Sequence, residues 1–136
     1  MRIVNPPDWP RPRGYANGIV AEGRFLFISG QVAWDENERF HSDDLVEQVR
    51  QALKNTLTML QAGGAKPEHV ARMTWYITDK REYLRRGKEI GAVYRELMGT
   101  HYPAMSMVQV AALMEDRARV EIEVTAVIPE GGPDAA

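Results

Sequence analysis

The stretch YPAMSMVQV at residues 102–110 is followed closely by VEIEV at residues 120–124. Each stretch repeats its side-chain character at every second position, which is the period of a β-strand. In the first stretch Met105 and Met107 therefore share one face of the strand. In the second, the two glutamates share one face and the apolar residues share the other. The chain thus ends in two strands, and the elements before them decide how that sheet is covered.

Hydrophobic periodicity predicts two helices and three further strands before this pair. Asp44 and Glu47 have the spacing of a helix capping box, and the glycines at 63–64 end the apolar stripe that follows. The run at 24–29 is apolar on both alternating faces, and the Glu-Gly pair before it is a hairpin signal. The expected strands span 19–21, 24–29, 69–78, 104–110 and 119–127, and the expected helices run from 45 to the glycine pair and over 81–98.

This order of elements predicts an α+β fold, in which a mixed β-sheet carries two helices packed on one face. The uncovered face is expected to hold Met105, Met107 and one side of the strand at 25–29. An apolar face of that size would meet water in a monomer, so we expect the protein to self-associate. The length of 136 residues predicts a single domain over residues 1–128, with a flexible C-terminal tail at 129–136.

Composition narrows the function. A net charge of −2 argues against a general nucleic-acid binder, and the basic residues at 80–88 are interpreted as a solvated helix surface rather than an RNA contact. The absence of cysteine removes thiolate nucleophiles and Cys-based zinc sites, and the three histidines lack metal-ligand spacing. No stretch has the length and apolarity of a membrane span or the pattern of a signal peptide. We expect a cytoplasmic protein with no metal and no cofactor.

Five blocks in this order resemble the RidA/YjgF family, small trimeric proteins best known as enamine/imine deaminases. The blocks are RGYANGI at 13–19, Ser-Gly-Gln at 29–31, a Gln-x-x-Gln-x-Leu-x-Asn pattern at 48–55, Pro-Ala-x-Ser at 103–106 and Glu-Ile-Glu at 121–123. The resemblance covers about residues 14–127. It implies the chorismate-mutase-like fold of that family, a homotrimer, and a small-molecule pocket at each subunit interface.

The resemblance also implies which residues form the pocket. In the family pattern the position of Met105 is an arginine that binds the substrate carboxylate, and a residue that is often asparagine corresponds to Gly91. Glu121 is interpreted as a catalytic, water-positioning residue, or alternatively as a strand glutamate that only satisfies backbone donors. The residues expected to bind substrate are Tyr15, Ser29, Gly30, Gln31, Met105 and Met107.

Met105 changes the expected chemistry, because methionine offers apolar contact and almost no hydrogen bonding. Loss of a charge-assisted bond worth about 1.5–3 kcal/mol lowers carboxylate binding by about one to two powers of ten. We therefore expect weak or no 2-imino acid deaminase activity and a changed, non-carboxylate substrate. One open question is whether another arginine, such as Arg117 or Arg119, reaches the pocket. Another is whether the trimer is instead a non-catalytic ligand-binding or protein-interaction protein. A ribonuclease is the third and most distant alternative.

Overall fold

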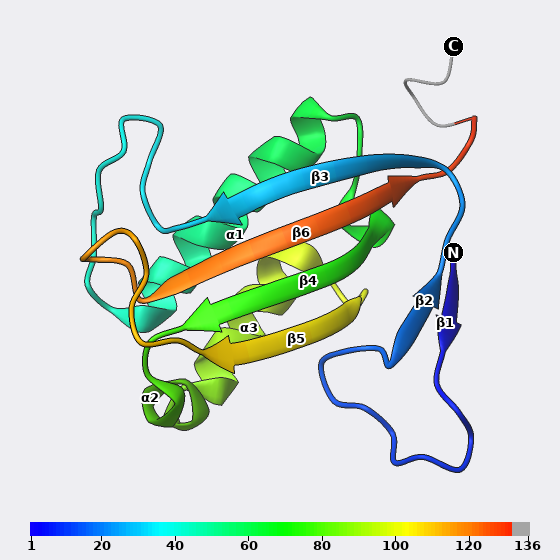
Figure 1. Cartoon of the computed structure of the whole chain (residues 1–136), viewed down its shortest axis with the longest axis horizontal. Helices are drawn as coiled ribbons and strands as arrows, with labels where there is room; N and C mark the ends of the chain where they lie inside the picture. The colour runs from blue at the N-terminus through cyan, green and yellow to red at the C-terminus, as the bar shows by residue number, and fades with distance from the viewer. Residues whose placement is uncertain (132–136) are drawn as a thin grey trace.

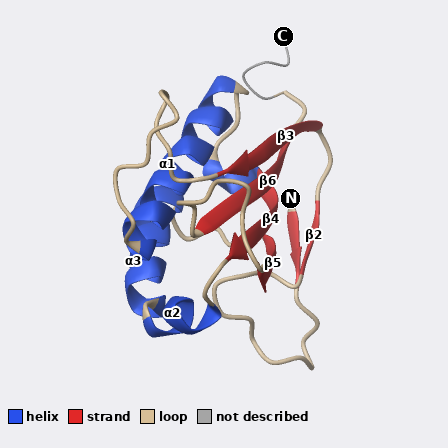
Figure 2. Cartoon of the chain, turned by 60° about the vertical axis from the view of Figure 1, so that its left-hand side comes forward, coloured by secondary structure: helices blue, strands red, loops and turns tan. Residues whose placement is uncertain are grey.

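A computed structural model gives the fold, and it describes residues 1–131. One four-stranded sheet forms the first layer, and the helices form the second layer on a single face of it (Figures 1 and 2). The strands are β1 (Arg2–Val4), β2 (Gly18–Val20), β3 (Arg24–Gln31), β4 (Val70–Ile77), β5 (Ala104–Gln109) and β6 (Val120–Ile128). The helices are α1 (Leu45–Ala62), α2 (Lys80–Arg85) and α3 (Gly87–Met98), with a short 3-10 turn, η1, at Pro67–His69.

The strand order in the sheet is β3-β6-β4-β5, so β3 and β5 are its edges. β6 runs antiparallel to both β3 and β4, whereas β4 and β5 are parallel. Parallel neighbours need a crossover connection, and α2 and α3 supply it. The α1 helix packs against α3, β6 and β3. The predicted α+β architecture with a mixed sheet is therefore confirmed.

The first helix begins and ends where the sequence predicts. The Asp44 carboxylate caps α1 by accepting a hydrogen bond from the backbone N–H of Glu47 at 3.1 Å. At the other end, the N–H of Gly63 donates to the carbonyls of Met59 and Leu60. Because these signals are local in the chain, the sequence alone is enough to place both ends.

The second predicted helix is two helices, which corrects the expectation of one helix over 81–98. α2 ends and α3 begins at Arg86, whose backbone leaves helical geometry at φ −98° and ψ 14°. The Arg86 side chain binds both carboxylate oxygens of Glu89 at 2.9 Å and Asp44 at 3.0 Å. These bonds lower the pKa of both carboxyl groups, with the Arg86 hydrogen bond as the main cause in each. The junction thus ties the start of α3 to the cap of α1.

The predicted hairpin between residues 19–21 and 24–29 is wrong. β2 pairs with β1 instead, and β3 pairs with β6. Residues 5–17 form the loop that joins β1 to β2, and this loop lies beside the start of β5 (Figure 1). The N–H of Ala16 in this loop donates to the carbonyl of Pro103 at 2.9 Å, which holds the loop against the sheet edge.

The face assigned to the two methionines is also corrected. In the β4–β5 ladder Met105 is paired with Met73 and Met107 with Trp75, and these partners belong to the buried core under the helices. Met105 and Met107 therefore lie on the helix-covered face, half-buried at the sheet edge. The open face carries instead the exposed Phe25.

Phe27 is likewise exposed on this open face, so part of the predicted apolar surface is present. The expected tail at 129–136 begins with a turn that reaches residue 131, and residues 132–136 lie outside the described part of the chain.

Candidate functional site

A cavity of about 250 Å³ lies between the edge strand β5 and the helices α2 and α3. We call it the Met105 cavity. It is lined by Arg13, Gly14, Trp75, Tyr83, Gly87, Ile90, Gly91, Tyr94, Arg95, Tyr102, Met105 and Met107. An outer hollow of about 320 Å³ shares five of these residues and adds Tyr15. The structure thus brings together three of the predicted binding residues, which are Tyr15, Met105 and Met107.

Two glycines in α3 leave the space for this cavity. Gly87 and Gly91 are one helical turn apart, so they lie on the same side of α3. A Cβ atom at Gly87 would meet no atom within 4 Å, and one at Gly91 would meet only the Arg95 guanidinium at 3.3 Å. The cavity therefore exists because this stripe of α3 has no side chains that could reach β5.

Aromatic side chains form much of the cavity wall. The rings of Tyr94 and Tyr102 stack at 5.4 Å, and those of Trp75 and Tyr83 meet edge to face at 6.4 Å. Burial raises the pKa of both Tyr83 and Tyr94, so these phenols stay protonated at neutral pH. The Tyr94 hydroxyl donates to the carbonyl of His101 at 3.0 Å. This aromatic part of the wall is thus largely apolar and uncharged.

The charge at the Met105 cavity comes from two arginines that sequence reasoning missed, Arg13 and Arg95. No aspartate or glutamate is among the lining residues of the cavity or of its outer hollow. Within one chain, neither Arg117 nor Arg119 lines it. Arg117 pairs with Asp43 at 3.0 Å and Arg119 with Glu82 at 2.8 Å. A signal for Arg13 was present, because it stands two residues before Tyr15 in the matched block.

The remaining predicted residues form a second cluster. A bulge in β3 falls between Ile28 and Gln31, and it carries Ser29 and Gly30. A Cβ atom at Gly30 would lie 2.5 Å from a carboxylate oxygen of Glu121, so the glycine makes room for that carboxylate. The side-chain amide of Gln31 donates to the Ser29 carbonyl at 3.0 Å.

This second cluster lies apart from the Met105 cavity in a single chain. Glu121 is paired with Tyr76 across the β4–β6 ladder, whereas Met107 is paired with Trp75. Successive residues of a strand point to opposite faces, so Glu121 lies on the open face and Met107 on the helix face. One chain therefore does not bring Glu121 and the two methionines into one site.

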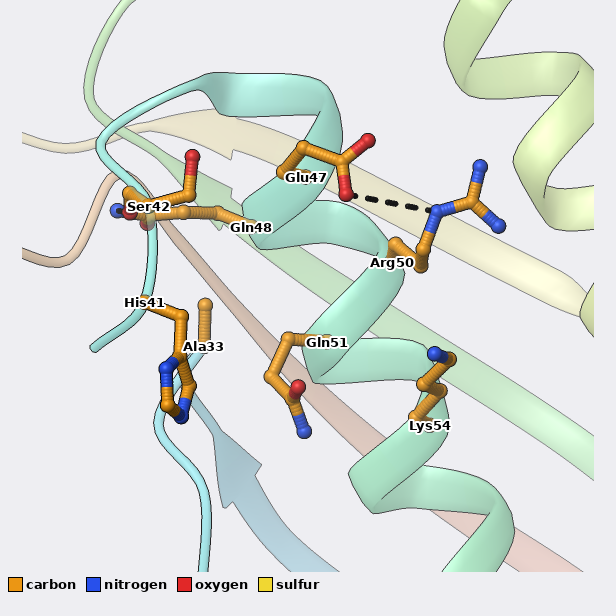
Figure 3. Close-up of a pocket in the computed structure, with 8 residues that line it drawn as sticks. All are labelled: Ala33, His41, Ser42, Glu47, Gln48, Arg50, Gln51 and Lys54. Carbon is orange, nitrogen blue, oxygen red and sulfur yellow. Dashed lines mark hydrogen bonds and ion pairs between the residues drawn. The ribbon is translucent and has the colours of Figure 1, made fainter. Parts of the chain in front are cut away.

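A smaller cavity of about 110 Å³ opens beside α1 (Figure 3), and its polar groups serve the fold. His41 binds Asp35 at 2.6 Å, and Glu47 pairs with Arg50. The buried Gln48 makes three hydrogen bonds to backbone groups. Most of its polar side chains are engaged in this way, whereas the Met105 cavity and its outer hollow hold three predicted binding residues, so we take the Met105 cavity as the candidate functional site.

Two absences hold for the described residues, 1–131. No three histidine or acidic side chains gather there in a group that could hold a metal ion. No helix among them has the length and apolarity needed to cross a membrane.

Comparison with known proteins gives the family. The family model described as endoribonuclease L-PSP matches residues 10–128. A RutC family protein of Pyrococcus horikoshii is 32% identical over 125 residues, covering 91% of this chain and 95% of its own. A human 2-iminobutanoate/2-iminopropanoate deaminase is 28% identical over 127 residues, covering 93% of this chain and 89% of its own.

The structural comparison agrees with this result. The crystal structure of YyfB from Yersinia pestis, a Rid family protein of unknown function, superimposes with a TM-score of 0.83 at 31% identity. The match covers 93% of this chain and 98% of YyfB. The chain therefore belongs to the Rid (RidA/YjgF) family.

Proposed function

We propose that this protein is an enamine/imine hydrolase of the Rid type, which acts in the cytoplasm as a homotrimer and binds its substrate at the Met105 cavity. Family membership supports the reaction type, and one relative at 28% identity is named a 2-iminobutanoate/2-iminopropanoate deaminase. The observation that carries the proposal is the position of Met105. In this chain Met105 lines a cavity together with Met107, and Tyr15 lines the adjoining outer hollow, so Met105 is accessible to a ligand rather than enclosed in the core.

A trimer would supply the acidic half of the site, which a single chain does not bring to the Met105 cavity. Phe25 and Phe27 leave 61% and 73% of their surface exposed on the open sheet face, and this supports self-association through that face. In the proposed trimer, a neighbouring subunit brings its cluster of Ser29, Gly30 and Glu121 to the Met105 cavity. The complete site then combines an apolar, cationic half from one subunit with an acidic half from the next.

The proposed reaction is addition of water to a C=N bond. Glu121 takes a proton from water while the water oxygen bonds to the imine carbon. The same carboxyl gives this proton to nitrogen, which completes a carbinolamine. It then carries the hydroxyl proton to nitrogen as the carbonyl forms and the C–N bond breaks, so nitrogen leaves as ammonia. The products are a carbonyl compound and ammonia, and no oxidant or cofactor enters this balance.

Met105 sets the expected substrate range. A methionine in place of a cationic side chain removes a bond worth about 1.5–3 kcal/mol, so short 2-imino acids should react about ten- to a hundredfold more slowly than with an arginine there. From Met105 alone we predicted a substrate without a carboxylate. The two arginines that line the cavity favour an anionic substrate instead, held at a different point.

Release of ammonia from a panel of imines tests the proposal. A dehydratase generates 2-iminobutanoate in place, and imines with and without carboxylates are supplied in parallel. We expect turnover of some panel members, slow turnover of 2-iminobutanoate, and a gain on that substrate in Met105→Arg. Fast 2-iminobutanoate turnover by the unchanged protein would overturn the argument from Met105. Sedimentation should give three times the chain mass of 15.4 kDa.

Glu121→Gln and Glu123→Gln form a matched pair for the catalytic role. Both glutamates lie on the open face of β6, and Glu123 accepts a bond from the Tyr76 hydroxyl at 3.4 Å. Only Glu121→Gln should abolish turnover while leaving the trimer intact.

The alternatives make different predictions in the same experiments. A trimer that binds panel members but turns over none of them is the non-catalytic binding or protein-interaction alternative. Ribonuclease activity, which the description of the family model raises, is the third candidate. RNA cleavage that disappears on further purification would remove it.

A further inference from the structure

The lining of the Met105 cavity carries an excess of positive charge. Within one chain Arg13 and Arg95 both line it and no carboxylate does, so one positive charge stays in excess when the partner subunit's Glu121 is added in the proposed trimer. Among residues 1–131 neither guanidinium makes a hydrogen bond or ion pair, whereas Arg50, Arg86 and Arg117 are each paired with an acidic side chain. Two unpaired cations at one opening attract an anion, and a guanidinium matches the two oxygens of a carboxylate.

The fold holds Arg13 at this position. Gly14, the next residue, has φ +77°, a conformation that glycine adopts without strain, and it turns the chain sharply. Ala16 then anchors the loop to β5 through its bond to Pro103 and its bridge to Ala104. The main chain at Asn17 is also fixed, because its N–H donates to the Asn5 side chain at 2.9 Å.

The exposed and buried lining residues divide the cavity into a mouth and a base. Arg13 and Arg95 are exposed, and they form the mouth. Trp75 and Ile90 are 2% and 3% exposed, and they form the base. Met105 and Met107 lie half-buried between the two. An anion at the mouth would therefore point an apolar body inward, against thioethers and aromatic rings.

The size of the site limits the ligand to a small molecule. The outer hollow, of about 320 Å³, falls at the lower end of the roughly 300–1,000 Å³ range of small-molecule sites, and the cavity itself, of about 250 Å³, lies just below that range.

From these observations we infer that the Met105 cavity binds 2-imino or 2-oxo acids with an aromatic side chain, with the carboxylate held between Arg13 and Arg95 and the ring packed against Met105 and Met107. The inference rests on the proposed function for the imino or oxo group, whereas the carboxylate and the ring follow from the cavity lining. The carboxylate then lies at the mouth, rather than beside position 105.

Calorimetric titration with phenylpyruvate tests this inference without any turnover. Pyruvate lacks the ring, phenylacetone lacks the carboxylate, and phenyl phosphate replaces the carboxylate with a phosphate. We expect phenylpyruvate to bind more tightly than all three, and its affinity to fall as salt is raised. Equal affinity for phenylacetone would overturn the anion site. Equal affinity for pyruvate would overturn the aromatic body, and tighter binding of phenyl phosphate would overturn the carboxylate assignment.

Arginine variants localise the contact. Arg13→Gln and Arg95→Gln should each weaken phenylpyruvate binding about fivefold, because the two groups are exposed and partly screened. Arg85→Gln is the matched control, since Arg85 is an exposed arginine of α2 that lines none of the cavities described above. Unchanged affinity in both Arg13→Gln and Arg95→Gln would overturn the proposed clamp.

The binding and turnover experiments distinguish failure of this inference from failure of the proposed function. A protein that binds phenylpyruvate through Arg13 but hydrolyses no imine keeps this inference and loses the proposed function. Hydrolysis of panel imines with no dependence on Arg13 or Arg95 keeps the function and refutes this inference.

Discussion

The side chain of Gln48 holds three separate segments together, and its removal should be one of the most damaging single changes on α1. Gln48 is 1% exposed. Its Nε2 donates to the carbonyls of Ser42 at 3.0 Å and Arg117 at 2.9 Å, and its Oε1 accepts from the N–H of Arg119 at 2.8 Å. The loop before α1 and the segment before β6 are thus fastened to one helix by a single amide.

Gln48→Leu keeps a similar volume and removes all three hydrogen bonds. Each bond contributes about 1 kcal/mol net, and the added apolar burial returns less than half of the total, so we expect a loss of about 1.5–3 kcal/mol. With an unfolding entropy of about 2.1 cal/mol/K per residue, that loss lowers Tm by about 5–10 °C for a chain of 136 residues.

Thermal unfolding followed by far-UV circular dichroism measures the effect. All variants must be compared at one protein concentration, because self-association would make Tm depend on it. Gln61→Leu is the control, since Gln61 is exposed on the same helix and its loss should cost less than about 0.5 kcal/mol. If the Tm values of the two variants agree within about 2 °C, the three bonds are not the tether that we describe.

Three further predictions concern stability. Asp44→Ala should cost about 1 kcal/mol by urea titration, whereas Asp44→Asn should keep most of the cap. Because Arg86 lowers the pKa of Asp44 in the folded state, the Asp44 carboxylate stabilises the fold above about pH 4, and this stabilisation is lost as pH falls through the folded pKa. If the stability of Asp44→Asn depends on pH in the same way as that of the unchanged protein, this reasoning is wrong. Gly23→Ala should prevent stable folding, seen as loss of soluble protein, since φ is +146° and a Cβ would lie 1.9 Å from the Ile128 carbonyl oxygen. Gly91→Ala should raise stability by up to about 1 kcal/mol, because alanine favours a helix and its Cβ meets little; a lower Tm would contradict the open space seen there.

Local signals in the sequence were sufficient for α1 and for the strand character of the sheet, and distant contacts account for most of what they missed. The cap at Asp44 and the glycine at 63 act on neighbouring residues, so they could be recognised from sequence. The break between α2 and α3 could not, because Arg86 reaches Asp44 from 42 positions away while the apolar stripe continues across the junction. The pairing of β1 with β2 likewise spans a long loop that propensity does not encode.

At the candidate site, too, local sequence patterns predicted some features, and contacts between distant segments determined the rest. Alternation along residues 104–110 correctly placed Met105 and Met107 on one face, but it could not decide which face the helices cover. That depended on the parallel register with Met73 and Trp75. Arg13 was missed because its position depends on the bond between Ala16 and Pro103, which joins segments far apart in the chain.

Gly91 lies inside α3, where glycine weakens a helix by about 0.5–1 kcal/mol relative to alanine. The chain thus keeps a less stable helix at one of the two glycine positions where a larger residue would project toward β5. Progressively longer side chains introduced at position 91 should narrow the Met105 cavity step by step without unfolding the protein. Because a Cβ atom at Gly91 would already lie 3.3 Å from the Arg95 guanidinium, a longer side chain there should change the size of the accepted molecule and the position of one entrance charge together.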